Sequence, residues 1–218
     1  ARFAVIDSGT FWLSETPDVL SGSWETSHYR SASWIVFEWL PTGLKFLHIN
    51  THLDHIGRVP RLVKQGFRGP IYCTHPTQEL AEILLLDAAH LQQEDAEYLN
   101  RKGLTKHTPA LPLFDETDVR EALALLRPLP LGRPQEVNHA FSFRYRDAGH
   151  LLGAASAEVT VRENGRETRV LFSGDVGRFD AVLAKDPEPA PDADYLVVES
   201  TYGNRTHPTL SVLDQLEG

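Results

Sequence analysis

Three polar segments of the chain each place histidine or aspartate beside glycine, directly after an apolar run. The densest, His52–Gly57, holds three potential ligands within four residues. The other two are Asp147–His150 and Ser173–Gly177. Imidazole and carboxylate are the natural zinc ligands where thiolates are absent. A solvated polar turn explains the first segment alone equally well, but recurrence of the pattern at three strand ends favours a shared metal site.

Hydrophobic periodicity and turn residues indicate the elements that must position these segments. The first 57 residues are β-rich, with two apolar runs that flank Pro41–Gly43 as a hairpin. Strands and short helices then alternate, and the chain returns to strands from residue 140, including a hairpin around Glu163–Gly165. Helices are predicted over 60–65, from Pro76 to near Gly103, and over about 116–126 after Asp115; strands are predicted over 70–74, 141–145, 157–161, 170–172 and 195–198, the last of them buried.

Composition and charge narrow the class of protein. Of 218 residues, 41% are hydrophobic and 23% are charged, which excludes a disordered, collagen-like or coiled-coil chain. No apolar run approaches the roughly 20 residues that a membrane span needs. The net charge of −9 argues against a general nucleic-acid coat. Local basic residues fit a solvated helix face and RNA contact equally well, and they are Arg58, Arg61, Lys64 and Arg68.

The chain has a single cysteine, Cys73. One cysteine excludes an internal disulfide and a cysteine-rich zinc module, and inside an apolar run it is expected in the core. Low cysteine usage also leads us to expect a reducing, cytoplasmic setting.

The order of the motifs resembles the metallo-β-lactamase superfamily, over about residues 51–207. The metal motifs of that superfamily are similar to His52–Gly57, Asp147–His150 and Ser173–Asp175. The sequence between and after these motifs resembles the β-CASP branch, which contains RNA-cleaving nucleases. The similar stretches are Gly57–Pro60, Gly66–Thr74, Leu80–Asp87 and Glu199–Gly203.

This resemblance implies the roles of individual residues. One zinc ion would use His52 and His150, a second would use Asp54 and His55, and Asp175 would bridge the two. Asp54 would also orient or deprotonate the attacking water, which makes it the candidate catalytic residue. Glu199 matches the acidic residue that precedes the inserted domain of the branch and is a candidate substrate-binding residue. The implied cofactor is one or two zinc ions, and the implied partner is RNA.

Two features depart from the pattern of this family. The superfamily motif is H-x-H-x-D-H, and its first histidine falls on Asn50, a poor zinc ligand. The family also expects further histidine motifs beyond the inserted domain, whereas this sequence stops at Gly218. Each metal would therefore keep three protein ligands, with the bridge counted, and three ligands plus water still make a tetrahedral zinc site.

The first 57 residues resemble a different family, the endonuclease/exonuclease/phosphatase superfamily. The resemblance lies in residues 10–18, in the tryptophans at 24 and 34, and in Asn50–His55. In that superfamily Asn50 and His52 would lie against the scissile phosphate, so Asn50 is a second candidate substrate-binding residue. Both families share the string Thr-His-Leu-Asp-His-x-Gly, which suggests that two unrelated coding segments join there.

Together these features predict an α/β fold, namely an incomplete αβ/βα metallo-β-lactamase-like sandwich with a foreign β-rich amino-terminal segment. The predicted domains are residues 1–50, residues 51–207, and the start of a truncated inserted domain at 208–218. The expected activity is zinc-dependent hydrolysis of RNA phosphodiesters. The alternatives are a Mg²⁺-dependent phosphodiesterase of the endonuclease/exonuclease/phosphatase type and an inactive fused or truncated chain.

Overall fold

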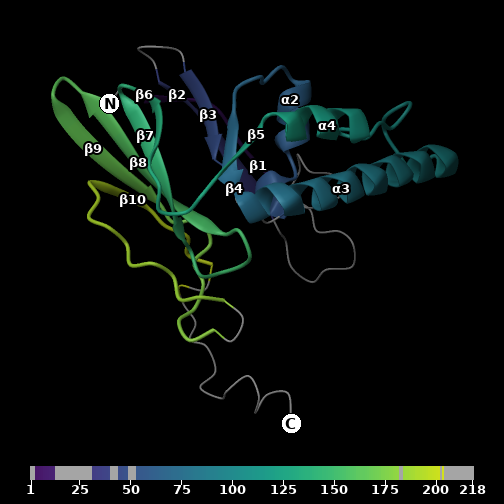
Figure 1. Ribbon diagram of the computed structural model, residues 1–218. Coiled ribbons are helices and arrows are strands. Elements are labelled where there is room, and N and C mark those ends of the chain that lie inside the picture. The colour runs from purple at the N-terminus through teal and green to yellow at the C-terminus, as the bar shows by residue number, and fades with distance from the viewer. Residues whose placement is uncertain are drawn as a thin grey trace, which may run out of the picture. The chain divides into compact units, whose positions relative to one another are not determined.

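The computed structural model describes the backbone of residues 3–12, 31–39, 44–48, 53–181, 184–201 and 203, and the side chains of these residues from His55 onward. The chain divides into two compact units, Ala1–Leu129 and Pro130–Gly218. Both units combine strands with irregular segments, and the helices of the described residues belong to the first (Figure 1). The predicted domain boundaries near residues 50 and 207 fall outside the described residues and stay predictions.

The first unit contains a five-stranded sheet in the order β1-β2-β3-β4-β5. β1 (Phe3–Trp12), β2 (Ser31–Trp39) and β3 (Leu44–His48) form an antiparallel meander. This pairing confirms the predicted hairpin around Pro41–Gly43. β4 (Ile71–Thr74) and β5 (Leu126–Leu129) then add in parallel to β3, so the sheet is mixed.

The sequence does not predict α1 (Leu53–Ile56), a single turn. The predicted helix over 60–65 is α2 (Val59–Lys64), which has a proline in its first turn. α3 (His75–Lys102) is capped by Thr74, whose hydroxyl accepts from the Thr77 amide, and ends at Gly103 in the left-handed conformation.

α4 (Glu116–Ala124) is capped by Asp115, the residue that the sequence places before it, and the cap is a reciprocal capping box with Asp118. The Asp115 carboxylate accepts from the Thr117 and Asp118 amides at 2.8 and 3.0 Å, and the Asp118 carboxylate accepts from the Asp115 amide at 3.0 Å. These contacts satisfy amides that the first helical turn leaves without partners.

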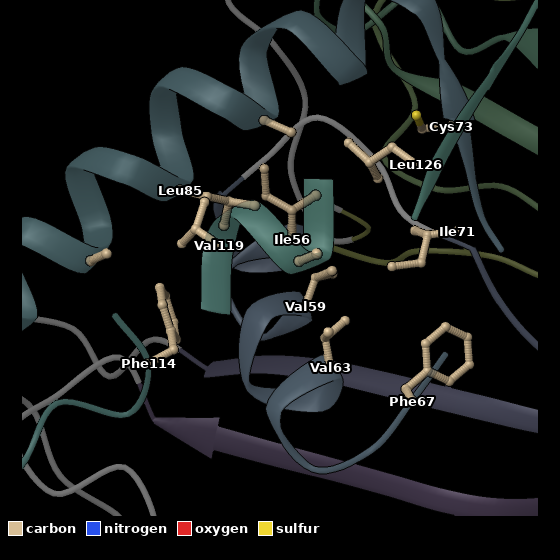
Figure 2. Packing of buried hydrophobic residues seen from close by; sticks show 13 residues of the cluster. Ile56, Val59, Val63, Phe67, Ile71, Cys73, Leu85, Phe114, Val119 and Leu126 are labelled. Carbon is tan, nitrogen blue, oxygen red and sulfur yellow. The ribbon is translucent and has the colours of Figure 1, made fainter. Parts of the chain in front are cut away.

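The core of the first unit lies between its helices and the parallel strands (Figure 2). Ile56, Ile71 and Val63 have no exposed surface, and Leu85 and Val119 reach them from α3 and α4. Cys73 is also fully buried, and burial raises the pKa of its thiol to about 12. The buried position of Cys73 confirms the expectation that it is a core residue.

The second unit is a five-stranded sheet in the order β10-β9-β8-β7-β6. β6 (Gln135–Asn138), β7 (Phe141–Asp147), β8 (Ala155–Glu163) and β9 (Arg166–Phe172) are antiparallel neighbours. β10 (Tyr195–Val197) adds in parallel to β9.

One face of this sheet is aromatic, as the alternation in β7 predicts. Phe141, Phe143 and Tyr145 are all buried, and neighbouring ring centroids lie 6.4 and 5.2 Å apart. The β8–β9 hairpin turns through Asn164 and Gly165, both at positive φ (51° and 75°), as a tight two-residue hairpin requires.

The prediction that residues 195–198 are buried is wrong. The exposed fractions of Tyr195, Leu196 and Val197 are 63%, 59% and 53%. β10 lies at the edge of the sheet, so its apolar side chains have a strand on one side only. No helix in the described part of the chain is long and apolar enough to cross a membrane.

Candidate metal centre

Three strands of the second sheet, β7, β9 and β10, run in the same direction, so their carboxyl ends lie along the same edge of the sheet, across the strand direction. β7 and β9 both run antiparallel to β8, and β10 runs parallel to β9. Three strands therefore end at the same edge, and the segments that follow them carry His150, Asp175 and Glu199. The structure thus brings three of the candidate residues to one edge of a single unit.

Hydrogen bonds join the three loops that leave this edge. The Gly177 amide donates to the Ala148 carbonyl at 2.8 Å, which ties the Asp175 loop to the His150 loop. The Val176 amide donates to the Glu199 carboxylate at 2.7 Å, and the Glu199 amide donates to the Ser173 hydroxyl at 3.1 Å. Each loop is thereby held by another loop, and none is positioned by its own strand alone.

Two glycines allow this close approach. A Cβ at Gly177 would fall onto the carbonyl group of Gly149 and lie 2.7 Å from the His150 amide nitrogen. Gly149 has φ +63°, and a Cβ there would lie 2.5 Å from the Pro187 nitrogen. Backbone thus packs directly on backbone beside His150 and Asp175, which only glycine permits.

The Glu199 carboxylate holds the Asp175 loop by accepting the hydrogen bond from the Val176 amide. Burial alone raises the pKa of this carboxyl, but hydrogen bonds from the Val176 amide and from the hydroxyl and amide of Thr201, with electrostatic attraction to His150, outweigh it. The pKa of Glu199 therefore lies below its ordinary value. An ionised Glu199 is a hydrogen-bond acceptor that positions the loop, and its role in substrate binding stays a prediction.

A charged network supports the His150 loop from the strand side. Glu158 accepts from Arg144 at 3.0 Å and from Arg146 at 2.8 Å. Arg146 also reaches Glu188, whose carboxylate accepts from the Asp147 amide and whose own amide donates to the Asp147 carbonyl. The segment around Glu188 is thereby held at the end of β7, close in the chain to His150.

Sequence reasoning missed this network. The alternation of arginine with aromatic residues in β7 was the available signal, because it puts Arg144 and Arg146 on one face. That Glu158 is their partner can be known only from the register between β7 and β8, in which Arg144 lies opposite Glu158.

Replacing Glu158 with glutamine is expected to lower the free energy of unfolding by about 2–3 kcal/mol at pH 7. Two guanidinium groups would lose their anionic partner at a site where the Glu158 side chain is only 7% exposed. The loss falls below that of a fully enclosed pair because Arg144 is 35% exposed. Urea denaturation of the two proteins measures the difference.

The same pair of proteins gives a pH dependence of known sign. Burial raises the pKa of Glu158, but the hydrogen bonds and charges of Arg144 and Arg146 outweigh it and hold the pKa below its ordinary value. Its stabilisation is therefore present above the ordinary carboxyl pKa of about 4 and is lost as the pH falls through the lower folded pKa. The gap between wild type and Glu158→Gln should close in that acidic window. A gap that stays constant down to pH 3, or one matched by Glu167→Gln at an exposed ion pair, would contradict a buried network.

The other half of the predicted site lies in the first unit. Asp54 and His55 belong to α1, whose last residue, Ile56, is anchored in the core. His55 is half-buried, while the side chain of Asp54 and the whole of Asn50 and His52 lie outside the described residues. The convergence of these residues with His150 and Asp175 therefore stays a prediction.

Two of the four basic residues that follow α1 form ion pairs with residues of α4. Lys64 pairs with Asp118 at 2.6 Å, and Arg68 lies 3.6 Å from Glu121. Arg68 also donates to the carbonyls of Val63 and Phe67. These two side chains thus hold helices together, which supports the helix-face interpretation for them over RNA contact.

The chemistry of the donors at both places fits zinc. His55, His150 and Asp175 supply imidazole and carboxylate groups, and the one thiol is buried elsewhere. Among the side chains that the structure describes, no group of three or more His, Cys, Asp or Glu residues gathers as a metal site.

Two curated proteins match most of this chain. "Ribonuclease TTHA0252" of Thermus thermophilus is 39% identical over 158 residues, which is 72% of this chain and 32% of that protein. "Transcription termination factor FttA" of Cenarchaeum symbiosum is 30% identical over 155 residues, which is 71% of this chain and 22% of that protein. This chain thus spans a third or less of the length of these relatives. No family model matches it.

Solved structures resemble the chain only weakly. A B3 metallo-β-lactamase with an active-site glutamic acid has 19% identity and a TM-score of 0.36, over 65% of this chain and 48% of that chain. An endonuclease/exonuclease/phosphatase family protein from Bacteroides thetaiotaomicron has 29% identity and a TM-score of 0.24, over 32% of this chain and 29% of that chain. Such TM-scores do not establish a shared fold, and the resemblance of residues 1–57 to the second family stays a prediction.

The relatives align with more than two thirds of the chain, and the motifs that carry the resemblance follow one another in the family's order. The mixed α/β architecture agrees with the predicted fold class. The matched part of this chain belongs to the metallo-β-lactamase superfamily, in its β-CASP branch.

Proposed function

We propose that this chain carries the metal-binding half of a zinc-dependent hydrolase that cleaves RNA phosphodiester bonds. The observation that supports the proposal is that hydrogen bonds join the three loops that carry His150, Asp175 and Glu199. The 39% identity to a protein named ribonuclease supports RNA as the substrate.

The residues proposed to hold zinc keep the roles that the family resemblance implies. His52 and His150 would hold one ion and Asp54 and His55 the other, and Asp175 would be shared by both. A bound zinc ion would supply Lewis acidity and positive charge beside the scissile phosphate. Magnesium is the less suitable ion for this set, because it prefers oxygen ligands and keeps much of its water.

The remaining steps belong to side chains of the chain itself. Asp54 orients the attacking water and accepts its proton. Ser173 and Glu199 keep the Asp175 loop in place: the Ser173 hydroxyl accepts from the Glu199 amide, and the Glu199 carboxylate accepts from the Val176 amide. Asn50 is proposed to contact the substrate phosphate through its amide.

The test is cleavage of a fluorescent single-stranded RNA by the purified chain, with zinc, with magnesium and with EDTA. Zinc-dependent cleavage of RNA that Asp175→Asn abolishes supports the proposal. Cleavage with magnesium alone supports the endonuclease/exonuclease/phosphatase alternative. No cleavage together with no zinc binding supports an inactive chain and overturns the proposal.

Replacing Asn50 with histidine is expected to raise the zinc affinity about tenfold. The substitution restores H-x-H-x-D-H, and an imidazole binds zinc where a neutral amide scarcely does. By linkage, tighter binding also raises the free energy of unfolding by about 1.4 kcal/mol per tenfold gain when zinc is in excess, so the melting temperature with zinc rises as well. Zinc titration of both proteins measures this effect. Equal affinities would mean that position 50 is not beside the metal.

A further inference from the structure

A turn just after Asp175 holds an aromatic ring in solvent. Phe179 is 66% exposed, an unusual state for a large apolar side chain. The next residue, Asp180, has φ +58°, and its amide donates to the Asp186 carboxylate at 2.8 Å. A left-handed non-glycine residue that is held by a hydrogen bond marks a turn of fixed shape.

This turn is fixed relative to the candidate metal centre. Gly177, two residues before Phe179, packs on the backbone of Gly149 and His150 and donates to the Ala148 carbonyl. Val176 is held by the Glu199 carboxylate. Phe179 is therefore carried by a short segment anchored at both ends, close in the chain to Asp175.

Other exposed apolar residues lie in the same two loops. Leu151 and Leu152 follow His150 directly and are 54% and 69% exposed, and Val176 follows Asp175 and is 42% exposed. Arg178, beside Phe179, is also exposed and has no ion pair with any residue that the structure describes. The surface around the candidate ligands thus combines apolar side chains with a cation.

A nucleotide matches this combination. Its base offers a flat face that stacks on an aromatic ring, and its phosphate is attracted to a guanidinium group. Stacking on one ring depends little on which base is present, because every base has a π-face.

We propose that Phe179 is a stacking platform for one nucleobase of single-stranded RNA, next to the phosphate that the candidate metal centre holds. Arg178 supplies positive charge for the backbone beside that base. This inference rests on the proposed function and adds to it how the substrate is positioned. It predicts little base preference at that nucleotide and poor use of a substrate that lacks the base there.

The test measures binding of the full zinc-loaded chain to two RNA 12-mers with phosphorothioate linkages, which resist hydrolysis. One has ordinary bases with a single 2-aminopurine, and the other is abasic at its central positions. Phe179→Ala should weaken binding of the first about tenfold and leave binding of the second unchanged within twofold. Phe179→Trp should keep the affinity and deepen the quenching of 2-aminopurine fluorescence that stacking causes. Leu111→Ala, at a residue 76% exposed in the first unit, serves as the matched control.

The possible failures are distinguishable. Equal affinities of wild type and Phe179→Ala for the base-containing RNA overturn the platform and leave the proposed function standing. An equal loss for both RNAs also overturns it, because the effect would then not depend on a base. If the wild-type chain binds neither RNA, the proposed function fails, and the platform fails with it.

Discussion

Replacing Asp175 with asparagine is expected to lower zinc affinity by about a hundredfold or more and to abolish RNA cleavage, since even partners that only orient a metal ligand are worth 10- to 100-fold. The proposed role of Asp175 is to bridge two ions with its negative charge, and an amide of the same size supplies no charge. The affinity is measured by competition with a chromophoric chelator, and the cleavage on a fluorescent RNA.

Asp180→Asn is the matched control for this substitution. It makes the same chemical change five residues along the same loop, and asparagine tolerates the left-handed backbone of Asp180 at φ +58°. Melting curves without metal establish that both variants keep the fold. If Asp175→Asn binds zinc as tightly as Asp180→Asn does, Asp175 is not a ligand.

The sequence was sufficient where a structure is formed by residues close together in the chain. Asp115 caps α4 through contacts with residues two and three positions along, and Pro76 and Gly103 delimit α3 in the same local way. The turn at Asn164–Gly165 is equally local. Such signals are reliable because no distant segment has to be placed first.

The sequence was insufficient where neighbours in space decide. Residues 195–197 have the apolar composition of a central strand, yet they form the exposed edge strand β10. Strand composition alone does not distinguish the two positions. Glu158 is the opposite case, because a charged residue on a strand suggests exposure, while the register across β7 and β8 encloses it between two arginines.

The candidate site shows both situations. Strand ends and glycines in the sequence indicate that His150 and Asp175 leave a sheet at related places, and the strand directions show that they share one edge. Which loop supports which could not be predicted, because the Gly177–Ala148 hydrogen bond and the Glu199–Val176 contact depend on tertiary packing. The convergence of His150 and Asp175 with Asp54 and His55 of α1 stays a prediction for the same reason.

Replacing Gly177 with alanine is expected to destabilise the second unit by about 3 kcal/mol, at the upper end for inserting a methyl group into a packed site. Gly177 is not at positive φ, so the penalty is steric alone: the new methyl group would occupy the position of the Gly149 carbonyl. Backbone cannot turn aside as a side chain can, so the Asp175 and His150 loops must separate, and zinc affinity should fall with stability. Urea denaturation and zinc titration measure the two effects. Gly203→Ala is the control, because its nearest neighbour, the Ser200 carbonyl oxygen, lies at an ordinary 3.4 Å. Equal stability of the two variants would show that the loops do not need the backbone contact, and a loss of stability without a loss of zinc affinity would show that the contact holds the fold but not the metal centre.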